Sequence, residues 1–319
     1  MNCRDQGVAR ADRPRLDGPR SSARLVSLVG IGVCLLAVEC LAVEPAALPT
    51  RPEEIRFAPL EFEPPAAADH RHVLPDGTVV YLAVSREFPL VTVSITFKGG
   101  SSLDPRTAPG LAATTAALVR EGGTATRPPA EIDETLDFLA TEVGVVSGGF
   151  FTTASMNCLA STFDESLSLF VEMLRTPGFD PGRLETTKAR QLAQLAQRND
   201  DAAAILSREW KRLVFGTDHF EAAEPTAASV EATSRDQLAA MHRRIFHPGN
   251  AIIAVSGDFD EPKMLAALAK AFSGWERGSV GPDPVSPTAT LAPGLYHVPK
   301  EIPQGKVLIG LRSIERDDP

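Results

Sequence analysis

The residues able to bind a metal ion or move a proton are few and widely spaced. His70 and His72, in the sequence HRH, could face one metal ion from an extended strand, but such a pair is more often solvated surface. His242 and His247 are five residues apart, so they do not share a helix face well. His219 follows a predicted helix in a turn. We expect no catalytic or metal site among the six histidines, which are His70, His72, His219, His242, His247 and His297.

The acidic and nucleophilic residues form no catalytic group either. The pair Asp200 and Asp201, and the cluster Glu131, Asp133 and Glu134, are typical of helix ends and first turns, where carboxylates complement the helix dipole. Serine and threonine are plentiful, yet no G-x-S-x-G elbow occurs. The sequence therefore gives no support for a serine hydrolase.

The elements that would position any site begin after a Pro/Ala-rich arm at 43–69. A β-branched run at 74–85 and an alternating run at 90–100 predict two adjacent strands. Strands and helices are mixed rather than strictly alternating, which favours an α+β fold with a mixed or antiparallel sheet packed with helices. Further strands are predicted at 150–159 and 250–260, and helices at 132–139, 163–174, 181–201, 202–215 and 261–272.

The N-terminus indicates export. Six arginines precede an apolar run from Leu25 to Val43, with a small residue at Ala42, so residues 1–42 resemble a cleaved signal peptide or an uncleaved N-terminal anchor. Removing them leaves Cys158 as the one cysteine, so no intrachain disulfide is possible. The formal net charge of -9, without a basic cluster outside the N-terminal end, excludes nucleic acid as an expected partner.

The C-terminal part contains the clearest domain boundary. Residues 277–295 are rich in proline and glycine and predict a linker after a domain at 70–276. A new strand pattern begins at 296–319, which we interpret as the start of a second, similar domain in a truncated chain.

Four stretches, in order, resemble the insulinase-like (M16) zinc peptidases, a family that includes pitrilysin and the mitochondrial processing peptidase. The stretches are LPDGTVVYLAVSREFPLVTVSITFKGGSSLDP, PGLAATTAALVREGGT, the helix from Lys188 to Asp201, and FHPGNAIIAVSGDFD. The resemblance spans about residues 70 to 315 and implies a half-molecule of that fold.

Active members of this family carry H-x-x-E-H, in which two histidines bind zinc and the glutamate activates water. The resemblance places Ala113, Ala116 and Ala117 at these positions, and Gln194 at the glutamate that is the third ligand. The family's supporting acid falls at Thr187. Methyl groups and an amide supply neither zinc ligands nor a base. We therefore expect no catalytic residue, cofactor or metal in this chain; the same alanines would also simply allow close helix packing.

The resemblance implies a noncatalytic homologue that holds an unfolded peptide for an active zinc-peptidase subunit in the periplasm or cell envelope. Strand addition near Thr92 to Gly100 would bind the peptide. The membrane would be contacted only through an uncleaved N-terminal segment. Two alternatives stay open: a structural or assembly scaffold with the same fold, and an active zinc endopeptidase that uses unrecognised ligands.

Overall fold

A computed structural model describes residues 51, 65–279, 281 and 292–311. The predicted signal or anchor at 1–42 lies outside these residues, as do most of the arm at 43–69 and most of the linker at 277–295. The described residues from 65 onward belong to one compact unit of the chain. Among the described residues, no helix is long and apolar enough to cross a bilayer.

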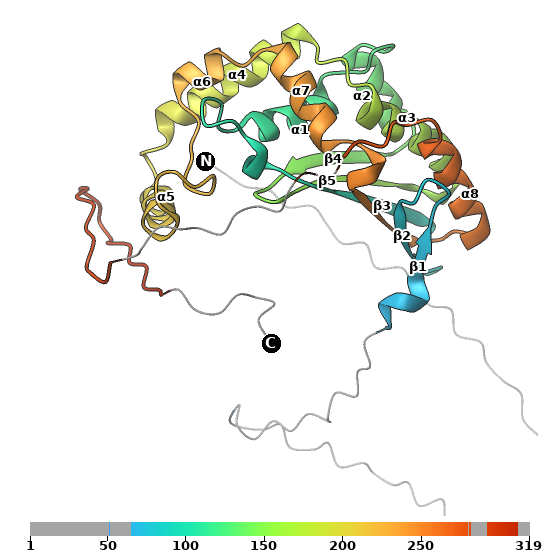
Figure 1. Cartoon of the computed structure of the whole chain (residues 1–319), viewed down its shortest axis with the longest axis horizontal. Coiled ribbons are helices and arrows are strands. Elements are labelled where there is room, and N and C mark those ends of the chain that lie inside the picture. Colours follow the sequence, from blue (N-terminus) through green and yellow to red (C-terminus); the bar gives the residue numbers. More distant parts are fainter. Residues whose placement is uncertain (1–50, 52–64, 280, 282–291, 312–319) are drawn as a thin grey trace, which may run out of the picture. The chain divides into compact units, whose positions relative to one another are not determined.

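A six-stranded mixed sheet forms the centre of this unit, with the strand order β1-β2-β6-β3-β5-β4 (Figure 1). β2 and β6 are parallel, and every other neighbouring pair is antiparallel. The mixed sheet and its helices confirm the predicted α+β class. The strands are β1 (Arg71–Val73), β2 (Val79–Val84), β3 (Leu90–Lys98), β4 (Glu142–Ser147), β5 (Phe151–Leu159) and β6 (Ala251–Gly257).

The position of β3 corrects two predictions. The strands expected at 74–85 and 90–100 exist as β2 and β3, but they are not neighbours, because β6 lies between them. The segment Thr92 to Gly100 is also not at an edge of the sheet. β3 pairs with β5 on one side and β6 on the other, so its backbone groups are already hydrogen-bonded. The edge strands are β1 and β4.

Eight α-helices accompany the sheet in the described part of the chain, and all five predicted helices are among them. Asp180, Asp201 and Asp260 cap three of these helices, each accepting a hydrogen bond from a backbone N–H in the first turn. The helices are α1 (Leu111–Glu121), α2 (Pro129–Phe138), α3 (Phe163–Arg175), α4 (Pro181–Gln197), α5 (Ala202–Phe215), α6 (Ala227–Glu231), α7 (Arg235–Ile245) and α8 (Glu261–Phe272).

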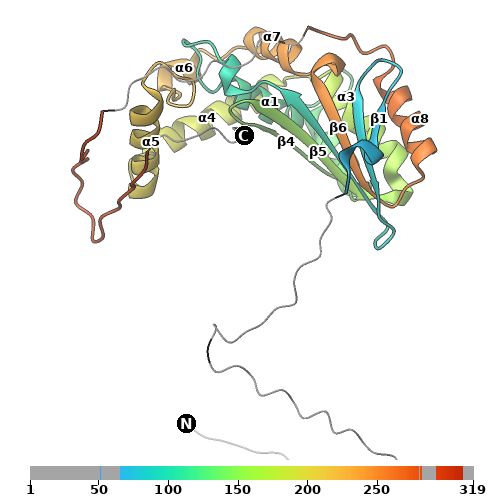
Figure 2. The same cartoon turned by 60° about the horizontal axis from the view of Figure 1, so that its bottom comes forward.

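Helices cover one face of the sheet, where α1, α3, α7 and α8 lie (Figure 2). Alternate residues of β3 are fully buried beneath them: Val91, Val93, Ile95 and Phe97 are at most 1% exposed. The intervening residues of β3 are polar or half-buried, as at Thr92, Ser94 and Thr96. The apolar core therefore lies on the helix side of the sheet.

The strand predicted from residue 296 onward is not formed within 292–311. Leu295, Ile309 and Leu311 are each more than 80% exposed. A strand needs a hydrogen-bonded neighbour, and none of the described strands pairs with this segment. The second domain and the boundaries given above thus stay predictions.

Candidate functional site

The three alanines that the resemblance places at the zinc-motif positions lie on α1. Ala113 is exposed, Ala116 is 1% exposed and Ala117 is half-buried. Gly110, with φ of 86°, turns the chain into the helix through a left-handed conformation that favours glycine. Ala113 and Ala117 are one helical turn apart and share a face of α1.

A half-buried carboxylate, Asp104, holds the start of α1. Asp104 accepts hydrogen bonds from the backbone N–H groups of Gly110 and Ala112, each at 2.7 Å. Burial raises the pKa of Asp104 to about 6, and these two hydrogen bonds and the nearby Arg244 lower it in part. Asp104 thus satisfies two of the unpaired N–H groups at the helix N-terminus from outside the helix.

The contact between α1 and α4 near the motif positions is made of neutral groups, whereas an ion pair of 3.4 Å joins Glu121, at the end of α1, to Arg190. Gln191 donates from its side-chain nitrogen to the Thr114 hydroxyl at 2.9 Å. The hydroxyl of Thr187 is buried without a partner among the described residues, and the side chain of Gln194 is exposed. Nothing here is a zinc ligand or a general base, so the residues at these positions do not fit a zinc site. No group of three or more metal-binding side chains occurs among the described residues.

The edge strand β4 lies beside α1 and presents free backbone groups. Gly148 donates its N–H to Phe151 in the turn to β5, so hydrogen-bonded and open pairs alternate from this point. Val143, Val145 and Ser147 therefore direct their N–H and C=O groups away from β5. Among the described residues, no hydrogen bond reaches the outward groups of Val145 and Ser147.

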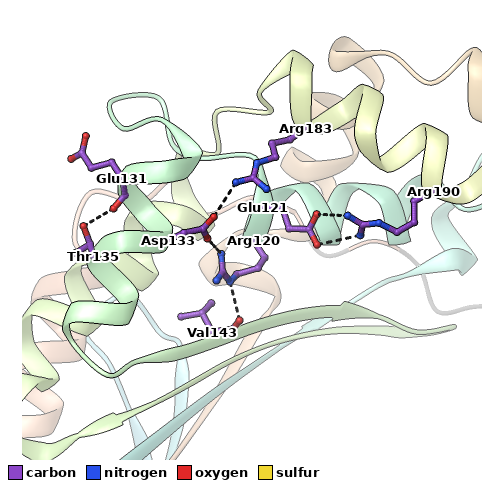
Figure 3. A network of polar contacts seen from close by, with 8 residues as sticks. All are labelled: Arg120, Glu121, Glu131, Asp133, Thr135, Val143, Arg183 and Arg190. Carbon is purple, nitrogen blue, oxygen red and sulfur yellow. Dashed lines mark hydrogen bonds and ion pairs between the residues drawn. The ribbon is translucent and has the colours of Figure 1, made fainter.

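The third residue with outward backbone groups on this edge, Val143, is bound by an arginine of α1 (Figure 3). Arg120 donates from Nε to the carbonyl oxygen of Val143 at 3.1 Å and from Nη1 to Asp133 at 2.9 Å. Arg183 of α4 donates to the second oxygen of Asp133 at 3.0 Å. Asp133 was expected only to complement a helix dipole; its partners are instead two arginines from other helices, because α1 and α4 both pass beside α2.

A cavity of about 640 Å³ lies where the start of α1 faces the end of β4. Its lining includes Asp104, Ala113, Ser147 and His219. The Nδ1 atom of His219 accepts the backbone N–H of Glu221 at 3.2 Å. The cavity therefore brings the first motif position together with the open end of the edge strand.

Three other histidines, His70, His242 and His247, are buried or contact backbone carbonyl groups. His242 is buried in α7, where its Nε2 atom lies 2.7 Å from the carbonyl oxygen of Leu174, and His247 is buried after that helix. His70 contacts the carbonyl oxygen of Leu82. The structure does not bring these rings together, and they lie outside the lining of the cavity beside α1.

Two family models match most of the described unit. Residues 79–219 match the model described as insulinase (peptidase family M16), and residues 232–319 match the model described as peptidase M16 inactive domain. The chain belongs to the insulinase (M16) family. Its described fold is that of a half-molecule of this family.

Curated relatives of this M16 chain carry two kinds of name. One is a non-peptidase homolog, YmxG of Helicobacter pylori, 23% identical over 225 residues, which are 70% of this chain and 52% of that protein. Another is an uncharacterized zinc protease of Mycobacterium leprae, ML0855, 26% identical over 196 residues, which are 60% of this chain and 44% of that protein. The chain thus spans about half the length of the curated relatives it matches.

Solved structures agree with the fold. The peptidase M16 inactive domain from Pseudomonas fluorescens is 25% identical with a TM-score of 0.64, over 68% of this chain and 53% of that one. The first half of the periplasmic protease PqqL from Escherichia coli is 17% identical with a TM-score of 0.60, over 69% of this chain and 48% of that one. This second likeness concerns the fold alone.

Proposed function

We propose that this M16 chain is a noncatalytic homologue that holds an extended peptide for an active zinc-peptidase subunit. One observation carries the proposal: the unpaired edge of β4 lies beside the face of α1 whose motif positions are alanines. The edge can bind a peptide backbone, and Ala113, Ala116 and Ala117 cannot cleave it.

The surroundings of the edge suit an extended chain. The outward N–H and C=O groups of Val145 and Ser147 repeat every second residue, which matches the backbone of another strand. Exposed apolar side chains lie close by in sequence, at Val146, Phe150 and Phe151, which are 70%, 42% and 54% exposed. They offer contacts to alternate side chains of a bound peptide.

The proposed partner and location are supported by the relatives and by the N-terminal residues. The relative named as a non-peptidase homolog supports the absence of catalysis. The basic and apolar character of residues 1–42 supports export, and so does the likeness to a protease described as periplasmic. An active M16 subunit would supply the zinc site that the alanines at the motif positions lack.

Peptide binding is the first test. A fluorescent peptide without stable structure is titrated against wild type and Val145→Pro, which removes an outward N–H and fills the edge with a ring. Binding without cleavage is expected for wild type, and weaker binding for Val145→Pro. Val146→Thr is the matched control, because the backbone of Val146 faces β5 and only its exposed side chain changes. Equal binding by all three proteins would show that the β4 edge does not bind the peptide.

The partner is tested in the cell that makes the protein. Tagged full-length protein is purified from the envelope fraction, and stoichiometric companions are identified by mass spectrometry. A relative with an intact H-x-x-E-H motif is expected. If the protein is purified alone or with unrelated envelope components, the paired-subunit proposal is wrong, and the hypothesis of a structural or assembly scaffold replaces it.

A further inference from the structure

The free edge of β4 ends at Arg120. A strand that adds to β4 would form its closely spaced hydrogen-bond pairs at Ser147, Val145 and Val143, because these residues face outward. The Nε atom of Arg120 lies 3.1 Å from the Val143 oxygen, where the N–H of the added strand would have to lie. Two of the three pairing positions are therefore open, and the third is taken.

Arg120 is held in this position by other side chains. Its Nη1 atom binds Asp133 at 2.9 Å, and Asp133 also binds Arg183 at 3.0 Å (Figure 3). The side chain of Arg120 is 27% exposed. A peptide that displaced Arg120 from Val143 would have to disturb this bridge between α1, α2 and α4. The arginine thus competes with the peptide backbone at a fixed site.

We propose that Arg120 is a specificity-determining residue that limits strand addition to Val145 and Ser147. The inference rests on the proposed function, since it concerns how a peptide binds the same edge. The chain selects short extended segments, because residues of the peptide beyond the second pair meet the guanidinium of Arg120 instead of a free carbonyl oxygen. Asp133 acts through Arg120 and is a positioning residue.

The proposal predicts a dependence on peptide length. The probes are acetylated, amidated peptides of alternating threonine and valine with a terminal lysine, about four and about six residues long, which reach about two and three pairs. Wild type should bind both lengths with similar affinity. Arg120→Met should bind the longer peptide about tenfold more tightly than the shorter one, because one more hydrogen-bonded pair forms. Asp133→Asn should show a smaller change in the same direction.

The matched control is Arg190→Met. Arg190 lies on α4 and pairs with Glu121, the residue after Arg120, at 3.4 Å, and within the described part of the chain none of its hydrogen bonds or ion pairs reaches β4. Its substitution should leave the length dependence as in wild type. Amide hydrogen exchange gives a second readout. Bound peptide should protect the Val145 N–H in every variant and the Val143 N–H only in Arg120→Met.

The outcomes separate the two proposals. Suppose that wild type binds peptide and that Arg120→Met shows the same length dependence and the same protection as wild type. In that case the proposal for Arg120 is wrong, and the β4 edge is still a peptide-binding site. If no variant binds peptide, the proposed function fails together with this inference. If the protein elutes as a dimer with the Val145 N–H protected before peptide is added, a second copy occupies the edge, and the inference is overturned.

Discussion

Arg120 and Val143, 23 residues apart in sequence, join α1 to the edge strand β4 through a hydrogen bond of 3.1 Å from the guanidinium Nε to the backbone carbonyl oxygen. The helix on which the family resemblance places the zinc-motif positions is thereby fixed to the strand that borders the same cavity. The hydrogen bond between Arg120 and Val143 is present although the side chains of Ala113, Ala116 and Ala117 cannot bind zinc.

Asp133→Asn should lower the free energy of unfolding by about 1 kcal/mol, because it weakens the pairs with Arg120 and Arg183, whose side chains are partly exposed. Urea denaturation followed by circular dichroism measures this difference. Asp137→Asn is the control on the same helix, since Asp137 is exposed, and it should change the value by less than about 0.5 kcal/mol. Equal effects would mean that the bridge does not stabilise the fold.

Restoring the family's ligands should create a zinc site. The triple substitution Ala113→His, Ala117→His and Gln194→Glu supplies two imidazoles one turn apart and a carboxylate from α4. We expect one zinc per chain by metal analysis after dialysis, and none in wild type. The control replaces Gln194→Glu with Gln191→Glu, which puts the carboxylate beside Thr114. If both triple variants bind zinc equally well, Gln194 is not the third-ligand position.

Asp104 should make stability depend on pH. Its pKa is raised to about 6 in the folded protein from an ordinary value of 3.8, so the folded state binds the proton more tightly. This contribution is fully present below pH 3.8 and is lost as the pH rises through about 6, with a size of at most about 3 kcal/mol. Carboxyl carbon shifts of labelled aspartate should titrate near pH 6 for Asp104. A midpoint below 4 would contradict the effect of burial.

His242 should make the stability of the fold depend on pH in the opposite direction. Burial lowers its pKa, while its hydrogen bond with Leu174 raises it in part. The unfolded chain therefore binds the proton more readily, and stability that is present above about pH 6.5 is lost as the pH falls. His242→Gln should flatten this acid-side loss in thermal unfolding curves between pH 5 and 7. His297 is exposed, so His297→Gln is the control, and its unfolding curves should match those of wild type. If the curves of His242→Gln also match wild type, His242 is not the cause of the loss of stability at acid pH.

Much of the local structure follows from the sequence. The alternation in Leu90–Lys98 predicts a strand with one buried face, and the structure buries Val91, Val93, Ile95 and Phe97. The helices predicted at 181–201 and 261–272 begin at Pro181 and Glu261, and the structure shows Asp180 and Asp260 capping them. Side-chain period and capping are local properties, so a single sequence reveals them.

Part of the candidate site could be predicted from the sequence, and part of it could not. The resemblance to the family places Ala113, Ala116, Ala117 and Gln194 at the positions of the zinc ligands and the base, and this assignment stays a prediction that depends on residue type alone. The strand β4 was missed, because Glu142–Ser147 is short and contains a glycine, which weakens the alternating pattern. Its position at the edge could not have been found from residue types.

The sequence by itself determined the class of fold and the family, since these depend on residue identity and short-range spacing. Only the tertiary structure decided that β6 lies between β2 and β3, that β4 is an edge, and that Arg120 and Asp133 meet across separate helices. Periodicity specifies which face of a strand is buried, but it does not specify the neighbour. The choice of neighbour depends on long-range packing and hydrogen bonds, which form only when distant segments fold together.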